Sequence, residues 1–529
     1  MTRPDAVSPA GGGCLPDQAV GRTESREAMI QSVLVVGGGS AGLLTALALK
    51  QQAPALEVRV VRSKDIGVIG VGESTTPQIV NLLFDYLKLP QKQFYSTVRP
   101  TWKTGIHFLW GPRTSFDYGF AFQLDGFYTD LDRYNGFYCG DDFDSVDMNA
   151  ALMAQGKAFE KHPSGQGPLI TPNTALHLFN PALVEALESA SVARGIEIVD
   201  ARITGVPVDE QGVRAVVLDD GRTFSADLYV DATGFRSELL GRALGTPFLP
   251  YDSSLFCDRA IVGSWDRTDE YIYPYTIAET MEAGWCWQID HEHAINRGYV
   301  YSSHFLSDDQ AREEFVQKNP KAKTWDHVVK FRSGRYEKGW VKNVFAIGNA
   351  CGFVEPLEAT ALMVASSQIK AMVEMLVQSQ LDPTPSLKAL YNTLFVDWWD
   401  GIRDFLSVHY RFNTRLQNEF WTACCNEVDV TPVQPLLDFY RENGPTGFCR
   451  HYVTSTIGQD NQFGLEGYLV MLVGQKVPYR DAHPPSEADM AIFRRHCADN
   501  RARAASGLTV AEALQYVHRP DWRWNSDAQ

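Results

Sequence analysis

The chain has 529 residues, of which 44% are apolar and 21% are charged, the balance of an ordinary globular protein that can bury a large core. Its formal net charge of −16, with no long basic run, argues against nucleic acid as a partner. No apolar run has the length of a membrane-spanning helix, so we expect no membrane contact.

The cysteines and the N-terminus indicate a compartment. Nine cysteines are an odd number and none lies in a C-x-x-C pattern, which favours reduced thiols in the cytoplasm over a disulfide framework. Residues 1–28 are rich in glycine, proline, serine and charge, and lack the apolar segment of a signal peptide. We expect a disordered extension that ends before Met29.

The most informative stretch is a glycine turn between a strand and a helix. Residues 32–36 are apolar and predict a short buried strand, and the helix starts at about Ser40. In this G-x-G-x-x-G pattern Gly37 allows the tight turn, Gly39 lets the backbone approach a pyrophosphate, and Gly42 lets helix and strand pack closely. The helix amides then face the phosphates. The pattern predicts a dinucleotide site; the alternative is a glycine-rich turn without a ligand.

Two features follow the turn. Residues 57–62 predict the second strand, but it ends in Arg62, where dinucleotide folds often have a carboxylate for a ribose hydroxyl. Residues 66–77 are glycine-rich and apolar, which suits a strap against a flat ligand or a simple turn.

Residues 101–110 alternate as one strand. Trp102 and Phe108 share one face, and Lys103 and His107 share the other. From the pattern alone, Lys103 is a strand lysine whose head reaches solvent.

The later elements suggest an α/β core. We expect a helix over 180–194, a strand over 196–200, a hairpin over 213–224, a strand over 227–231, a β-rich layer over 259–305, and mostly helices from about 361.

Residues 344–362 form a second decisive stretch. A buried strand ends at Gly348 and a helix begins near Thr360. Free amides around Thr360 and Ala361 would make an anion site, and the Thr360 hydroxyl adds a donor. Glu358 stands beside them, either as a functional carboxylate or as a capping or dipole partner of the helix.

At this point the chain resembles the flavin-dependent halogenases of the tryptophan-halogenase type, from Met29 to about Phe412. The W-x-W-x-I-P motif, which separates these enzymes from flavin hydroxylases of the same fold, departs here only in Asp290, which replaces the proline. The motifs that carry the resemblance are Gly37–Gly42, Ile69–Thr75, Gly284–Ile289, Lys330–Arg335 and Gly352–Thr360.

The resemblance implies the fold class and the domains. We expect an α/β fold with an FAD-binding, Rossmann-like core of the flavin monooxygenase type, a β-rich middle layer and a mostly helical C-terminal part. The halogenase core would cover 29–380, and a substrate-covering region 381–529.

The resemblance also implies the activity. FADH2, supplied by a separate flavin reductase, and O2 would oxidise chloride or bromide to hypohalous acid, which then halogenates a small indole- or phenol-like aromatic. We expect no metal, and a homodimer is one possible assembly. The alternatives are a single-component FAD-dependent aromatic hydroxylase, or a flavin-binding protein without catalysis.

Site residues follow by position. Lys103 would hold or react with hypohalous acid, and Glu358 would stabilise the cationic intermediate and take its proton. Thr360 and Ala361 would bind the halide, and Trp285 and Trp287 would keep substrate from the flavin, although core packing also explains paired tryptophans. The cofactor contacts fall on Gly37, Gly38, Gly39, Ala41, Gly42, Ser63, Ile69, Val71, Ser74, Arg202, Asn349 and Leu362.

The substrate clamp of free-tryptophan enzymes has no clear match in residues 450–470. Free tryptophan is therefore a doubtful substrate, and an indole, a phenol, or a larger or carrier-bound aromatic remains open.

Overall fold

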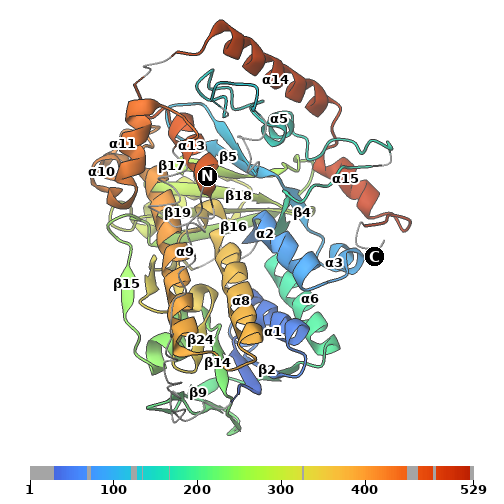
Figure 1. Cartoon of the computed structure of the whole chain (residues 1–529), viewed down its shortest axis with the longest axis vertical. Coiled ribbons are helices and arrows are strands. Elements are labelled where there is room, and N and C mark those ends of the chain that lie inside the picture. Colours follow the sequence, from blue (N-terminus) through green and yellow to red (C-terminus); the bar gives the residue numbers. More distant parts are fainter. Residues whose placement is uncertain are drawn as a thin grey trace, which may run out of the picture.

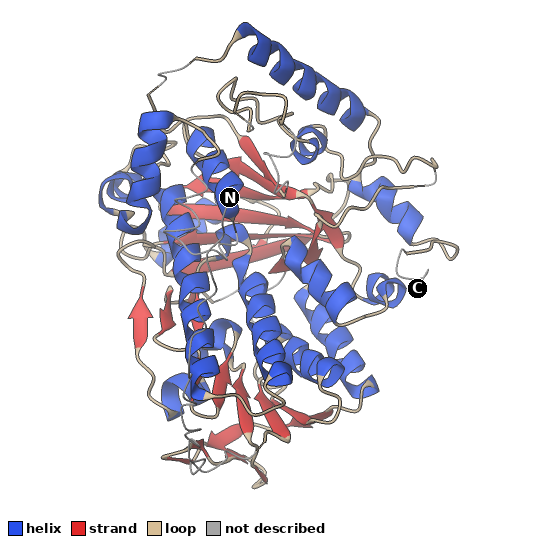
Figure 2. Cartoon of the chain, in the orientation of Figure 1, coloured by secondary structure: helices blue, strands red, loops and turns tan. Residues whose placement is uncertain are grey.

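The computed structural model describes residues 29–67, 73–120, 128–133, 135–165, 167–324, 327–448, 463–480 and 484–524. The predicted extension over 1–28 and the candidate cofactor contacts Ile69 and Val71 lie outside these residues. Two sheets dominate the fold: one lies toward one end of the long axis, the other crosses the upper middle of the view below α14, and helices pack along their sides (Figure 1; Figure 2).

A six-stranded sheet forms one end of the molecule. Its order is β23-β24-β14-β1-β2-β8, and all neighbours are parallel except the edge pair β23–β24. The central strands are near-continuous apolar runs, as expected of parallel strands buried in an α/β fold. The predicted strands near 32, 57, 196, 227 and 344 are confirmed. The strands are β1 (Ser32–Val36), β2 (Glu57–Arg62), β8 (Glu197–Asp200), β14 (Leu228–Asp231), β23 (Trp340–Val341) and β24 (Val344–Ala346).

An eight-stranded sheet forms the β-rich layer. Its order is β20-β16-β19-β18-β17-β5-β6, and β21 pairs with β16. The predicted layer over 259–305 corresponds to β16–β19, and β5 joins it parallel to β17. The strands are β5 (Gly105–Leu109), β6 (Phe116–Gly119), β16 (Arg259–Asp266), β17 (Tyr275–Met281), β18 (Gly284–Asp290), β19 (Ala294–Tyr301), β20 (Lys323–Thr324) and β21 (Val329–Lys330).

The prediction of one strand over 101–110 is wrong. The chain breaks at Thr104, whose N–H and hydroxyl both donate to the carbonyl oxygen of Pro274, at 2.7 and 2.9 Å. The preceding strand, β4 (Thr101–Lys103), therefore leaves the eight-stranded sheet and pairs with β7 (Ala175–Leu178), which also pairs with β3 (Glu73–Ser74).

The remaining strands form small sheets. The predicted hairpin over 213–224 is present as β12–β13, which pair antiparallel. These strands are β9 (Ile203–Gly205), β10 (Val208–Asp209), β11 (Gly212–Val213), β12 (Val216–Leu218), β13 (Thr223–Phe224), β15 (Phe248–Pro250), β22 (Gly334–Tyr336) and β25 (Gly352–Phe353).

The C-terminal part is helical, as predicted. Helices α8 and α9 run side by side along the long axis, while α13 contacts β6, α14 contacts α5, and α15 contacts β4 (Figure 1). The helices are α1 (Ser40–Gln52), α2 (Pro77–Val80), α3 (Gln91–Thr97), α5 (Met148–Ala154), α6 (Asn180–Ala193), α7 (Asp308–Lys318), α8 (Thr360–Gln378), α9 (Pro385–Arg411), α10 (Glu419–Glu427), α11 (Gln434–Asn443), α13 (Gly464–Gly474), α14 (Glu487–Ala505) and α15 (Val510–Val517).

Among the described helices, α8 is long and apolar enough to cross a membrane, which corrects the sequence-based statement that no run has this length. Of its most apolar window, 61% is buried inside the protein. The helix packs on α1 and α9, so its apolar character has an explanation in the core.

A tryptophan in β18 depends on a glycine in β19. Trp287 and Gly298 are directly opposite in the antiparallel pair, and a Cβ at position 298 would lie 1.9 Å from the Trp287 ring. The indole therefore lies flat across the neighbouring strand, in space that only glycine leaves open.

We expect Gly298→Ala to displace the Trp287 ring and lower the free energy of unfolding by about 1–3 kcal/mol. Thermal unfolding, with Gly205→Ala as a control, measures this. At position 205 a Cβ would come no closer than 3.7 Å to a neighbour. Equal stability of the two variants would contradict the expectation.

Candidate functional site

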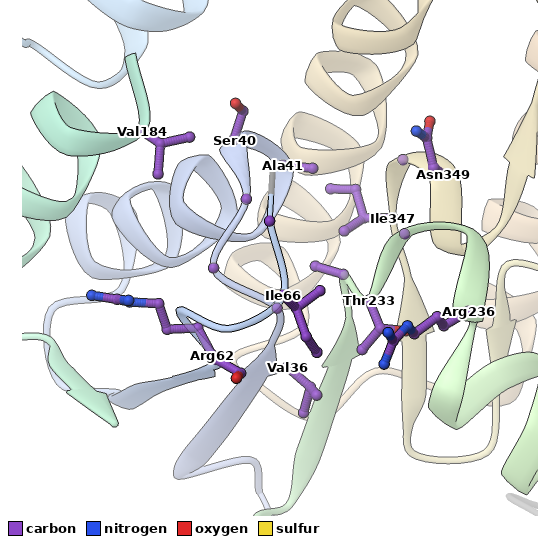
Figure 3. A pocket seen from close by; sticks show the side chains of 18 of the residues that line it. Val36, Ser40, Ala41, Arg62, Ile66, Val184, Thr233, Arg236, Ile347 and Asn349 are labelled. Atoms are coloured by element: carbon purple, nitrogen blue, oxygen red, sulfur yellow. The ribbon is translucent and has the colours of Figure 1, made fainter. Parts of the chain in front are cut away.

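A cavity of about 520 Å³ opens where the parallel strands β1, β2 and β14 end. This is the edge at which open α/β sheets bind their ligands. Arg62 and Asn349 are seen on opposite sides of the glycine turn in Figure 3. Of the predicted cofactor contacts, those that line the cavity are Gly37, Gly38, Gly39, Ala41, Ser63, Arg202, Asn349 and Leu362.

The three motif glycines meet the three requirements of a dinucleotide turn. Gly37 has φ +120°, and a Cβ there would lie 2.1 Å from the carbonyl oxygen of Ala232. At Gly42 a Cβ would lie 2.0 Å from the Gly37 carbonyl oxygen, so helix and turn could not pack. At Gly39 a Cβ would meet nothing within 4 Å, which leaves the backbone open to the cavity. The turn fits a dinucleotide pyrophosphate.

The unusual Arg62 is neutralised by a carboxylate from another element. Its guanidinium donates to Glu188 on α6 at 3.1 Å, and its Cβ packs where a Cβ of Gly38 would lie, 2.6 Å away. Glu188 also lines the cavity. A carboxylate thus lies beside the end of β2, but it comes from α6 and is paired with Arg62, which no motif in the sequence indicated.

Lys103 is fully buried, so the interpretation as a solvent-exposed strand lysine is wrong. Its Nζ donates to the carbonyl oxygen of Thr75 at 3.1 Å and lies 5.1 Å from the ring centroid of Phe120. Burial lowers the pKa of this ammonium to about 7, against an opposing effect of the Glu358 carboxylate. Lys103 therefore changes its charge near neutral pH.

Glu358 lies at the end of a 3₁₀ turn and is buried with an ion-pair partner. Its Oε1 is 2.7 Å from Nε2 of His409, at the end of α9, and Nδ1 of that histidine is 2.9 Å from the Phe405 carbonyl oxygen. Both ring nitrogens of His409 therefore face oxygen atoms, and one of them faces the carboxylate. The capping interpretation is wrong, since the N-cap of α8 is Ala359 and no side chain caps it.

The first turn of α8 presents unpaired donors. Ala359 has φ 57°, a left-handed conformation that starts the helix abruptly at Thr360. The Thr360 hydroxyl is buried and has no hydrogen-bond partner among the described residues. Ala361 lines the cavity. A small anion fits this donor set, because the first amides of a helix have no acceptor within the helix and the hydroxyl has none among the described residues.

The two tryptophans of β18 lie next to one another, with ring centroids 6.0 Å apart. Trp285 is fully buried and donates from Nε1 to Oε2 of Glu355 at 2.7 Å. Ser74, a predicted cofactor contact, does not line the cavity of the glycine turn; its hydroxyl lies 2.8 Å from that of Thr276. Neither Glu355 nor His409 was singled out from the sequence, because their partners are distant along the chain.

The protein combines a Rossmann-like cradle with a buried lysine and a buried carboxylate, a combination that suits a flavin enzyme which makes a reactive species away from water. A family model described as tryptophan halogenase matches residues 32–490, and the chain belongs to that family.

Individual relatives agree with the assignment. The tryptophan 6-halogenase ThaL of Streptomyces albogriseolus is 31% identical over 79% of this chain and 83% of its own length. The structure of MibH, a lanthipeptide tryptophan 5-halogenase, is 37% identical, with a TM-score of 0.83 over 94% of this chain and 95% of that one. The tryptophan 6-halogenase SttH of Streptomyces toxytricini is 27% identical, with a TM-score of 0.82 over 92% and 100%.

Membership of the tryptophan halogenase family gives the general activity of the protein. The protein is a flavin-dependent halogenase of an aromatic substrate, it uses FADH2 and a halide ion, and a separate flavin reductase supplies the reduced flavin. The predicted fold class, an FAD-binding α/β core with a helical C-terminal part, is confirmed.

We expect Lys103→Met to stabilise the protein near pH 8 by about 3 kcal/mol. In the folded protein the pKa of Lys103 is lowered from 10.5 to about 7. Between pH 7 and pH 10.5 this lysine is therefore protonated in the unfolded chain but mostly neutral in the folded protein. The cost of burying the lysine is therefore lost as the pH rises from 7 to 10.5, and the two stability curves should converge. Denaturant unfolding at several pH values measures this, with exposed Lys338→Met as control. A variant less stable than wild type at pH 8 would contradict the expectation.

We expect His409→Leu to destabilise the protein by about 3 kcal/mol, because it leaves the buried Glu358 carboxyl without its partner. Adding Glu358→Gln to this variant removes the uncompensated charge and should restore at least half of the loss. Denaturant unfolding of the two single variants and the double variant forms the test. Additive losses would show that the pair is not coupled.

Proposed function

We propose that this halogenase acts on the indole ring of a tryptophan residue carried on a peptide. The support is the 37% identity with the lanthipeptide halogenase, against 27% for SttH, over similar shares of the chain. The lack of a recognisable clamp for free tryptophan in residues 450–470 favours the same choice. A free indole or phenol is the other candidate substrate class.

Lys103 presents the oxidant in this proposal. Reduced FAD and O2 supply the two-electron oxidant that converts halide to hypohalous acid. The Lys103 ammonium then donates a hydrogen bond to the oxygen of that acid and polarises its bond to the halogen. Its burial and its pKa of about 7 support this role, since such a donor is strong in a dry site and also exists partly as a free amine.

Glu358 receives the proton. When the ring attacks the halogen, the ring becomes cationic, and a nearby carboxylate in a dry site stabilises it. Glu358 takes the ring proton and passes it to the hydroxide left by hypohalous acid, so that arene and HOX give haloarene and water. The contact between Glu358 and His409 supports this role, because the imidazole can share the proton that the carboxylate takes up.

Thr360 and Ala361 bind the halide in our proposal, supported by the buried, unpartnered Thr360 hydroxyl and the uncapped start of α8. Ala361 lines the cavity of the glycine turn, which brings the halide near the cofactor. Trp285 and Trp287 separate substrate from flavin. The cradle residues hold the FAD pyrophosphate by their amides, and the backbone at Gly39 makes the close approach.

The biological setting is also a proposal. Seven free cysteines among the described residues support a reducing, cytoplasmic compartment. The net charge of −16 supports the absence of nucleic acid, and the burial of α8 supports the absence of membrane contact. We further propose a division into a core over 29–380 and a substrate-covering region over 381–529, and a homodimer as one possible assembly.

The deciding experiment supplies the protein with FAD, a flavin reductase, NADH, O2 and bromide or chloride. Substrates are a tryptophan-containing peptide blocked at both ends, free tryptophan, indole and a phenol. We expect halogen isotope patterns in the mass spectrum of the peptide, at a rate at least about tenfold above free tryptophan. Lys103→Met should abolish them, because the bound oxidant is lost, while flavin oxidation continues.

Two other outcomes of this experiment would contradict the proposal. Halogenation of free tryptophan in preference to the peptide would overturn the substrate class. Hydroxylated product without halogenated product, formed without a reductase, would instead support the single-component hydroxylase.

A further inference from the structure

Two buried carboxyl groups, three residues apart, contact two consecutive residues of α9. Glu358 contacts His409, and Glu355 accepts a hydrogen bond from the hydroxyl of Tyr410. Both carboxyl groups belong to the loop that leads into α8. The last turn of α9 therefore holds this loop at two points.

Glu355 joins this turn to the tryptophan pair. It is fully buried, and its Oε2 accepts from Tyr410 and, at 2.7 Å, from Nε1 of Trp285. Its Oε1 has no hydrogen-bond partner among the described residues. Burial raises the pKa of this carboxyl to about 7. Burying a carboxyl group costs free energy, and the two hydrogen-bond donors that Glu355 aligns give a reason for its presence here.

Tyr410 is itself fixed. Its ring stacks on Trp421 at 5.8 Å between centroids and meets the edge of Trp110 at 6.0 Å. Its hydroxyl also lies 3.5 Å from Sγ of Cys257. The hydroxyl that donates to Glu355 thus has little freedom to move, and Glu355 transmits that position to the Trp285 indole.

We propose that Glu355 is a positioning residue which, anchored by Tyr410, fixes the Trp285 indole, so that one turn of α9 sets both the tryptophan pair and Glu358. This rests on the proposed function, in which Trp285 and Trp287 separate flavin from substrate. Without the Tyr410 hydroxyl the Trp285 indole is free to move. Reduced flavin is then oxidised without halogenation, since FADH2 and O2 give FAD and hydrogen peroxide.

The first test uses the protein without flavin or substrate. In a ¹⁵N-labelled sample the indole N–H signals of the twelve tryptophans are recorded, and Trp285→Phe assigns the one of interest. We expect its hydrogen exchange to be slow in wild type and in Glu355→Gln, which keeps an oxygen acceptor. In Glu355→Leu it should be at least about tenfold faster, because the acceptor is gone. Equal exchange in all three proteins would overturn the proposal.

The second test measures coupling, the halogenated product formed per FADH2 oxidised. Tyr410→Phe removes only the anchoring hydroxyl, and we expect coupling to fall about threefold or more while the KM for halide stays within about twofold. Tyr440→Phe is the matched control, since it removes another buried tyrosine hydroxyl, 3.4 Å from the Val477 carbonyl oxygen. Coupling in Tyr410→Phe equal to that in the control would overturn the proposal. If wild type halogenates no substrate, the proposed function fails, whereas the exchange measurement still decides the role of Glu355.

Discussion

The burial of charge is the constraint on which the site depends. Lys103, Glu355 and Glu358 all lie away from water, where an ionised group without partners costs several kcal/mol. Each is given partners: a backbone carbonyl for the lysine, two donors for Glu355, and a histidine for Glu358. A site that must keep a reactive oxidant from water needs dry surroundings, and these contacts make dry surroundings compatible with polar side chains.

Helix α9 connects that dry region with the cofactor end of the molecule. Near its start, Asn392 accepts from the backbone N–H groups of Gly339 and Trp340, next to β23 of the parallel sheet. Midway, Asp400 accepts two hydrogen bonds from Arg335, at 2.8 and 2.9 Å. The last turn then reaches the two carboxyl groups. Helix α9 is therefore attached to β23 of the parallel sheet and, through Tyr410, Glu355 and Trp285, to β18 of the eight-stranded sheet. Its course along the molecule is seen in Figure 1.

Local signals in the sequence predicted five strands of the parallel sheet, the glycine turn and the family, because each depends on residues adjacent along the chain. The burial of Lys103 was not predictable in this way, because the break after it depends on Pro274, whose carbonyl takes both donors of Thr104. His409 and Tyr410 were likewise missed, since an amphipathic helix pattern does not show which side chains meet a distant loop. The roles of the predicted site residues stay predictions.

The order of strands in the parallel sheet has a consequence for how the protein is made. Its neighbours β1, β14 and β24 come from residues 32–36, 228–231 and 344–346, so the cofactor cradle combines segments separated by some three hundred residues. Such non-local pairing slows folding, because long loops must close before contacts form. On the ribosome the cradle cannot be completed until β24 has emerged, nor Glu358 paired until α9 has. A fragment that ends before α9 would therefore lack the partner of Glu358, and one that ends before β24 would lack the complete cradle as well.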